Sequence, residues 1–338
     1  MTRRENGLWQ QQLTVVENGR KKQKYFYGHT KQEVLRKIAA YKEQAANGPA
    51  FGDVAELWWE EAVESLAWNS LKNYRPNYER LKKYFSGLYI AQIRPSDLNR
   101  FMRDFTRKNH ASDKTARNQL MVANLIFKYA VANGYLELNP AREITVPKDL
   151  KKSRREMPSG DDISRIKASV GLPFGLFAYM ALYTGMRRGE LLALTWEDVD
   201  TSAGEITISK SLYHEGNSPR VKAPKTAAGV RIVPIVAKLA EHLKPTTGPV
   251  FPGADGGYLT SSGFDRLWRQ YVQSSGITCT PHQLRHAYAT MLFENGIAEA
   301  DAQDLLGHAQ ISTTMDIYTH IRESHKKQIR DKLLNVDI

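Results

Sequence analysis

The chain has 338 residues, with 48 Lys+Arg against 36 Asp+Glu, a formal net charge of +12 and a pI near 9.5. Apolar residues at 41% and charged residues at 25% are ordinary for globular proteins, so the composition excludes a largely disordered chain, and the length predicts two or three domains. The single cysteine, Cys279, excludes an intramolecular disulfide framework, while a polar start and the lack of an apolar run of ~20 residues predict a soluble, cytoplasmic protein.

The basic surplus is concentrated near the N-terminus. Residues 1–48 carry 10 Lys+Arg against 4 Asp+Glu, whereas residues 49–150 carry 15 against 12 and residues 151–338 carry 23 against 20. Half of the surplus therefore lies in the first seventh of the chain. Such a surplus is typical of a protein with a polyanionic partner, and a solvated basic surface is an equally good explanation.

Residues 1–48 are predicted to form a small β-sheet followed by one helix. Strand-like segments at 8–16 and 22–27 flank Asn18-Gly19, a strong hairpin signal, and Thr30 with Glu33 forms a capping box that begins the helix. Cations and aromatic rings alternate on the second strand. This pattern favours a sheet face that contacts DNA, and a solvated hairpin is the alternative. The candidate DNA-binding residues here are Lys21, Lys22, Lys24 and Tyr25.

Residues 51–146 are predicted to be all-helical. Four helices are expected, beginning near residues 53, 71, 96 and 112, and apolar residues spaced by 3.6 give each of the last two a core stripe. Two Ser-Asp pairs, Ser96-Asp97 and Ser112-Asp113, are the expected N-caps of the third and fourth helices. The second helix is predicted over 71–85, where Pro76 is tolerated only near the first turn.

The start of the fourth helix and the segment after the bundle are both basic. Lys114, Arg117 and Asn118 lie in the first helical turn, where they suit phosphate contact or base reading, although an exposed basic helix start explains them almost as well. Residues 147–158 are dense in charge and poor in apolar residues, which predicts a linker. Such a tether suits a protein that closes around a duplex, and a merely solvated linker is equally compatible.

Residues 159–338 are predicted to mix helices with one short β-hairpin, and two of their motifs involve single cations. Arg187 lies at a predicted helix start after Gly185, where a cation is unfavourable unless an anion binds there, and Glu190 is expected to hold its guanidinium in place. Lys225 is placed near the tip of a hairpin with strands at 205–213 and 230–233. A lysine at a hairpin tip is more often simply a solubilising residue.

Two further motifs contain histidines. Thr280 and Pro281 are a natural N-cap and N1 residue, so His282 and Arg285 are expected on one helix face. No Glu follows the first His and no cysteine cluster accompanies it, so the sequence predicts no metal site. Gly307 is expected to end a later helix, with His308 directly after it and Tyr318 ten residues on. Taken singly, each motif has a structural explanation.

In this order, Arg187, Lys225, His282-x-x-Arg285, His308 and Tyr318 resemble the tyrosine recombinase family of phage and conjugative-transposon integrases, and the resemblance extends over the whole chain. It implies a mainly α fold with small β elements (α+β). It further implies an arm-type DNA-binding domain at 1–48, a helical core-binding domain at 51–146, the linker at 147–158, and a mixed α/β catalytic domain at 159–338 with a C-terminal tail. That tail packs on a neighbouring protomer or on its own domain.

The resemblance also implies the reaction. The enzyme would be a DNA strand-transferase that cleaves and rejoins DNA through a 3′-phosphotyrosine, for integration or excision of a phage or mobile element. Tyr318 would be the nucleophile, Arg187 and Arg285 would grip the phosphate, Lys225 would be the acid, and two histidines, His282 and His308, would complete the site. Neither a cofactor nor a metal is implied. The implied partners are double-stranded DNA at core and arm sites, a homotetramer on DNA, an excision factor and a host DNA-bending protein.

Three alternatives follow from the same residues. A repressor or architectural DNA-binding protein that has lost catalysis is disfavoured by the full set of six catalytic positions. A topoisomerase of the same chemistry would need no second DNA site, so the arm-like segment argues against it. A metal-dependent transposase or nuclease would need a carboxylate cluster, and no acidic triad is obvious in the sequence.

Overall fold

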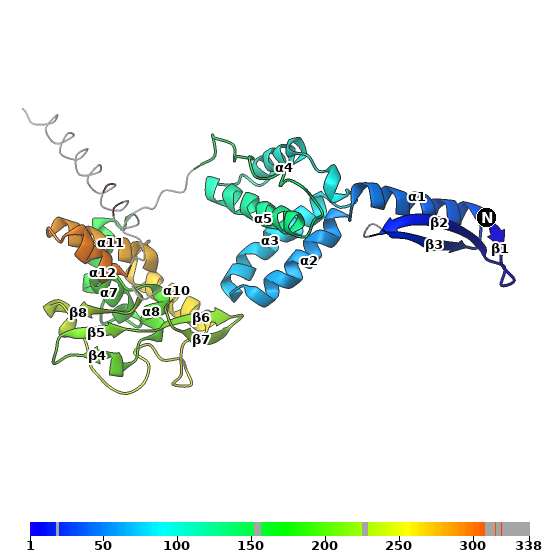
Figure 1. Cartoon of the computed structure of the whole chain (residues 1–338). Coiled ribbons are helices and arrows are strands. Elements are labelled where there is room, and N and C mark those ends of the chain that lie inside the picture. Colours follow the sequence, from blue (N-terminus) through cyan, green and yellow to red (C-terminus); the bar gives the residue numbers. More distant parts are fainter. Residues whose placement is uncertain (18–19, 152–156, 225–228, 308–314, 316–318, 320–338) are drawn as a thin grey trace, which may run out of the picture. The chain divides into compact units, whose positions relative to one another are not determined.

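The computed structural model describes residues 1–17, 20–151, 157–224, 229–307, 315 and 319, with the backbone alone for residues 16, 17, 20, 21 and 44–46. The chain divides into two compact units, residues 1–154 and 155–338, which we describe separately (Figure 1). The described residues are mainly helical, with small antiparallel sheets. The predicted α+β fold class is therefore confirmed. The finer division into arm, core-binding and catalytic domains with a linker stays a prediction.

The first unit begins with a three-stranded antiparallel sheet and a helix. The sheet has the order β1 (Thr2–Arg3), β2 (Trp9–Glu17), β3 (Arg20–Gly28), and α1 (Lys31–Asn47) contacts β2 and β3. The Thr30 hydroxyl accepts a hydrogen bond from the Glu33 amide at 3.1 Å, which confirms the predicted helix start. The predicted turn at Asn18-Gly19 lies outside the described residues.

Among the described residues, four helices and a short 3₁₀ turn complete this unit. They are α2 (Phe51–Ser65), α3 (Trp68–Tyr84), η1 (Ile90–Gln92), α4 (Pro95–Lys108) and α5 (Asp113–Ala132). Their apolar faces enclose a core in which the ring of Phe51 lies 5.2 Å from that of Phe85 and 5.5 Å from that of Phe127. The four-helix expectation for residues 51–146 is confirmed because each apolar stripe has a facing partner to pack against.

Two details of these helices differ from the sequence prediction. α3 begins at Trp68, so Pro76 lies in the helix interior rather than near its first turn; the buried side chains of Tyr78 and Leu81 hold the helix in place around it. α4 begins at Pro95, one residue before the predicted cap, because Asp97 accepts from the Arg94 amide at 3.0 Å and so acts as the third helical residue. α5 is capped by Ser112, as expected.

In its described residues, the second unit has seven helices and two small sheets, with one apolar helix at the centre. The helices are α6 (Gly160–Ala168), α7 (Gly175–Thr184), α8 (Arg188–Ala193), α9 (Ala237–Ala240), α10 (Ser261–Ser275), α11 (Pro281–Glu294) and α12 (Glu299–Leu306), with a 3₁₀ turn η2 at Trp196–Asp198. Nearly every residue of α7 is buried, and α6, α8, α9 and α11 contact it. α7 is therefore the central helix against which the site-bearing elements are placed (Figure 1).

The strands of the second unit correct the predicted hairpin. β4 (Val199–Asp200), β5 (Glu205–Ile208) and β8 (Arg231–Pro234) form one sheet, and β6 (Ser211–Glu215) and β7 (Ser218–Lys222) form another. The segment predicted as a single strand over 205–213 is thus two strands. β5 does pair with the strand predicted at 230–233, but an additional hairpin turns between them at Gly216, whose φ is +61°.

Close packing of α8 on β6 depends on Gly189. A Cβ placed on Gly189 would lie 2.6 Å from the backbone oxygen of Leu212 and 2.6 Å from the Ser211 hydroxyl oxygen. We therefore expect Gly189→Ala to lower the free energy of unfolding by about 1–3 kcal/mol, because the added methyl group forces α8 away from the strand. Chemical denaturation measures the effect. Gly160→Ala is the matched control because no atom lies within 4 Å of a Cβ there; equal stability of the two variants would contradict the packing argument.

Candidate active site

Arg187 and Arg285 are brought together by a close contact between α7 and α11. α7 ends at Gly185 in a left-handed conformation with φ of +60°, and a Cβ there would lie 2.3 Å from Cδ1 of Tyr288 in α11. Glycine is required at this point for both reasons. The chain then turns to Arg187, the N-cap residue of α8, while Arg285 Nη1 of α11 donates to the Gly185 carbonyl at 2.7 Å.

Glu190 holds Arg187 as the sequence predicted. Its carboxylate accepts from the Arg187 backbone amide at 2.7 Å and from Arg187 Nη1 at 2.7 Å. The carboxylate is buried, with 6% of the side chain exposed, whereas 43% of the Arg187 side chain is exposed. The guanidinium is therefore fixed from the protein side and still accessible to a ligand from solvent.

Arg231 of β8 is a member of this site that sequence reasoning missed. Arg231 Nη2 and Nη1 donate to the two oxygens of Glu190 at 2.8 and 3.2 Å, which is a two-pronged ion pair with both side chains buried. Arg231 and Val233 face inward on β8, whereas Val230 and Ile232 are more than half exposed. Because apolar residues occur on both faces of this strand, alternation alone could not indicate that the arginine points inward.

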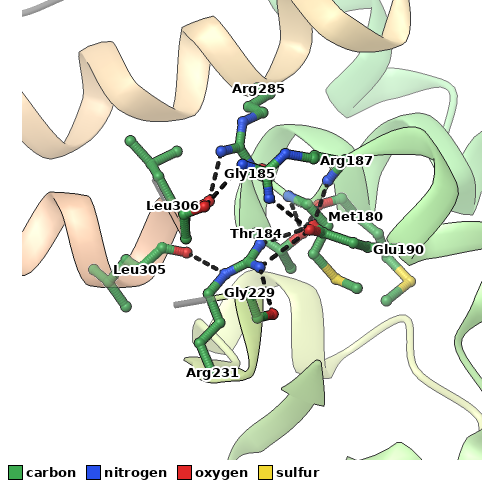
Figure 2. A network of polar contacts seen from close by, with 12 residues as sticks. Met180, Thr184, Gly185, Arg187, Glu190, Gly229, Arg231, Arg285, Leu305 and Leu306 are labelled. Atoms are coloured by element: carbon green, nitrogen blue, oxygen red, sulfur yellow. Dashed lines mark hydrogen bonds and ion pairs between the residues drawn. The ribbon is translucent and has the colours of Figure 1, made fainter. Parts of the chain in front are cut away.

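The C-terminal end of α12 joins the three arginines (Figure 2). Arg231 Nε donates to the Leu305 carbonyl at 2.8 Å, Arg285 Nη2 to that of Leu306 at 2.5 Å, and Arg187 Nη2 to that of Gly307 at 2.8 Å. These three consecutive carbonyls are among those that a helix leaves without intrahelical partners, at the end of its dipole that carries partial negative charge. Each one is therefore satisfied by a different cation.

The electrostatics of the cluster favour an anion. Three guanidinium groups, Arg187, Arg231 and Arg285, lie around the carboxylate of Glu190, so these four side chains carry a net charge of +2. Burial alone would raise the pKa of Glu190, but its bonds with Arg231 and Arg187 lower it to about 2. Burial, and then the charge of Arg187, lower the pKa of Arg285 to about 9. A phosphate-like anion would offset the repulsion, and guanidinium forks bind such oxygens with two parallel hydrogen bonds.

Of the other four predicted catalytic residues, the structure describes only His282. His282 is exposed on α11, the helix that carries Arg285, and its ring lies 4.8 Å from that of His286. Lys225, His308 and Tyr318 lie outside the described residues. The structure thus brings together Arg187 and Arg285, and the roles of all six residues stay predictions.

The part of the chain that the structure describes contains neither a metal-binding cluster nor a membrane-spanning helix. In that part, no three His, Cys, Asp or Glu side chains are grouped so that they could hold a metal ion. Nor does any described helix have the length and apolar character needed to cross a membrane.

The predicted DNA-binding residues belong to the first unit. Lys22, Lys24 and Tyr25 are exposed on β3, with the Lys24 ammonium 4.2 Å from the centre of the Tyr41 ring; the side chain of Lys21 lies outside the described residues. Lys114, Arg117 and Asn118 are in the first turns of α5, and Arg117 Nε donates to Asp113 at 2.7 Å, so this cation already has an acidic neighbour. The contact of these residues with DNA stays a prediction.

Comparison with known families gives two matches. Residues 50–146 match the Phage integrase SAM-like domain, and residues 166–325 match the Phage integrase family. A tyrosine recombinase XerC-like protein of Caldanaerobacter subterraneus is 27% identical, with 95% of each chain covered. The tyrosine recombinase XerC of Xylella fastidiosa is 30% identical over 65% of this chain and 74% of its own length. The ICEBs1 integrase of Bacillus subtilis is 27% identical over 77% of this chain and 78% of its own length.

Solved structures show the same fold. The Tn1549 transposon integrase in complex with transposon right end DNA superposes with a TM-score of 0.68 at 19% identity, covering 82% of this chain and 99% of that one. A lambda integrase dimer bound to a COC′ core site gives a TM-score of 0.62 at 17% identity, covering 93% of both chains. A lambda integrase tetramer bound to a Holliday junction gives 0.62 at 18% identity, covering 91% of this chain and 94% of that one.

Acid titration tests the buried carboxylate. The pKa of Glu190 is about 2 in the folded protein and 4.5 ordinarily, so its contribution to stability is complete above pH 4.5 and is lost as the pH falls toward 2. At 1.36 kcal/mol per pKa unit this contribution is about 3 kcal/mol. We expect Glu190→Gln to be less stable than the wild type at pH 7 and to lose less further stability on acidification. Urea unfolding at several pH values measures this. The exposed Glu294→Gln serves as the control, and a wild-type acid dependence in Glu190→Gln would contradict the assignment.

Proposed function

The chain belongs to the tyrosine recombinase family, a family of DNA strand-transferases, and on that premise we propose that it cleaves and rejoins duplex DNA through a 3′-phosphotyrosine intermediate. The observation that carries the proposal is the convergence of Arg187 and Arg285 on one site with a surplus of positive charge. The scissile phosphate is the anion that this arrangement suits.

The two arginines would act by stabilising the transition state. Attack on a phosphodiester produces a pentavalent species with added negative charge on its non-bridging oxygens. Arg187 is fixed by Glu190, and Arg285 is fixed by the Gly185 carbonyl, so neither guanidinium has to be reoriented as the charge develops. Preorganised donors of this kind contribute about 3–4 kcal/mol each in other enzymes.

The reaction itself consists of attack by the nucleophile on the phosphate, with a proton transfer at each end. The Tyr318 hydroxyl oxygen attacks phosphorus, the bond from phosphorus to the 5′ oxygen breaks, and the enzyme is left joined to the 3′ phosphate. A tyrosine has an ordinary pKa of ~10, so a histidine takes the phenolic proton; His282 shares α11 with Arg285. Lys225 gives a proton to the leaving 5′ oxygen, and His308 hydrogen-bonds the phosphate. Attack by a new 5′-hydroxyl reverses these steps without ATP because the covalent link retains the bond energy.

We further propose that the chain integrates and excises a phage or other mobile element. The similarity to the ICEBs1, Tn1549 and lambda integrases supports this role. In this proposal residues 1–48 bind arm sites, residues 51–146 bind the core site, and residues 159–338 carry out catalysis as a homotetramer on DNA. An excision factor and a host DNA-bending protein would be further partners. The exposed cations and ring of Lys22, Lys24 and Tyr25 support arm-site binding.

The nucleophile is tested with a suicide substrate, a nicked duplex that traps the covalent intermediate. We expect Tyr318→Phe to form no covalent complex because it lacks the attacking oxygen, while its affinity for the same duplex stays within about 3-fold of wild type. Denaturing gel electrophoresis after incubation with DNA from the flanks of the encoding gene measures the trapping. The control is a variant at a different tyrosine, Tyr213→Phe, which should trap normally. Trapping by Tyr318→Phe would refute the assignment.

The arm-site proposal is tested on two kinds of DNA. We expect the double variant Lys24→Ala/Tyr25→Ala, and deletion of residues 1–48, to weaken binding to distant arm sites at least ~10-fold, because phosphate contacts and ring contacts are lost. Cleavage at isolated core sites should be unchanged. Electrophoretic mobility shifts on separate arm and core duplexes measure this. A uniform loss on both duplexes, or no loss on either, would contradict an arm-specific role.

A further inference from the structure

We propose that Arg231 is a positioning residue for DNA cleavage, which holds both the Arg187–Glu190 pair and the end of α12 in the arrangement that the reaction requires. The inference rests on the proposed function, in which Arg187 grips the phosphate and Tyr318 follows α12 in the chain. Arg231 itself is not among the residues expected to touch DNA.

All three guanidinium nitrogens of Arg231 are used within the protein. Nη1 and Nη2 bind the two oxygens of Glu190, and Nε donates to the Leu305 carbonyl at 2.8 Å. Only 5% of its side chain is exposed, against 43% for Arg187. Arg187 is therefore accessible to a ligand, whereas Arg231 is buried, as Arg285 is, and cross-links α8, β8 and α12.

The geometry requires a planar fork. One group has to donate in two parallel directions to a carboxylate and in a third direction to a helix carbonyl. An arginine has five N–H donors in fixed directions, whereas a lysine ammonium is a point charge that cannot span both partners. Removal of the fork would leave Glu190 buried with one strong partner fewer, and it would leave the Leu305 carbonyl without the donor that it has here.

Arg187 and Arg285 have a second task that Arg231 lacks. Both donate to the end of α12, at Gly307 and Leu306, and in the proposed reaction both also bind the phosphate. Arg231 also binds the end of α12, but in the proposed reaction it does not bind the phosphate. Its loss should affect the rate of cleavage more than the affinity for DNA.

The kinetic test compares Arg231→Lys and Arg231→Met with wild type on a suicide substrate. At saturating DNA we expect cleavage to slow roughly 10- to 100-fold, the cost of misplacing reacting groups by about 1 Å, while the half-saturating DNA concentration changes less than ~3-fold. Lys210→Met is the matched control because it breaks another ion pair of the same unit, with Asp198 at 2.8 Å, and it should cleave normally. Unchanged cleavage by both Arg231 variants would overturn the proposal, as would a loss confined to DNA affinity.

The pH profile separates positioning from a general loss of stability. Among the described residues, the charged groups that face Glu190 are Arg187, Arg231 and Arg285. Without Arg231 the pKa of Glu190 rises, so protonation at mildly acidic pH releases Arg187. The cleavage rate of Arg231→Met should therefore fall more steeply on the acid side than that of wild type and Lys210→Met, in which only the proposed histidine base is protonated. A pH profile with the wild-type shape would count against the proposal.

A measurement without DNA keeps this proposal distinct from the proposed function. Hydrogen exchange of α12 (Glu299–Leu306) in the free protein should be faster in Arg231→Lys and Arg231→Met than in Lys210→Met, because one anchor of the helix end is lost. Equal exchange would overturn the anchoring role even if cleavage were slow. If instead wild type traps no DNA while α12 exchanges faster in the variants, the recombinase function fails and the anchoring role stands. Thermal unfolding shows whether each variant is folded. If Arg231→Met does not fold, Arg231→Lys, which keeps the positive charge, provides the test.

Discussion

The arginine cluster of the second unit depends on one buried carboxylate, that of Glu190. Three guanidinium groups lie close together there, and without a counter-charge their mutual repulsion would separate α8, β8 and α11. Glu190 accepts from Arg187 and from both ends of the Arg231 fork, so two of the cations are neutralised in part and the third is left in an electropositive environment. A buried ion pair of this kind adds little net stability over an apolar pair, and its value lies in fixing where charged groups point.

The site also depends on close packing of its helices at two glycines, Gly185 and Gly189. α7 and α11 can pack closely only because Gly185 has no Cβ, and α8 lies against β6 for the same reason at Gly189. These two glycines flank Arg187 in sequence, within the run Thr184–Glu190. The position of the arginine is therefore determined by contacts of the main chain on either side of it as well as by the carboxylate that it binds.

Much of the fold could be predicted because its signals are local. The capping residues Thr30 and Ser112 and the Pro281 helix start each depend on atoms a few residues apart, and all appear where expected. The pairing of Arg187 with Glu190 is local as well. Arg231 was missed because its partners lie 41 and 74 residues away, and the β6–β7 hairpin was missed because β5 and β6 read as one continuous strand. Tertiary packing, which no window of sequence contains, decides both.

The bonds that fix the end of α12 also determine when the arginine cluster can form during synthesis of the chain. Arg187 reaches a carbonyl 120 residues further along, and Arg231 one that is 74 residues further along. Neither bond can form until the ribosome has released the chain as far as the end of α12, and the same holds for the bond from Arg285 to Leu306. A chain that ends before α12 therefore contains Arg187 and Arg231 without the carbonyls that orient them in the complete fold.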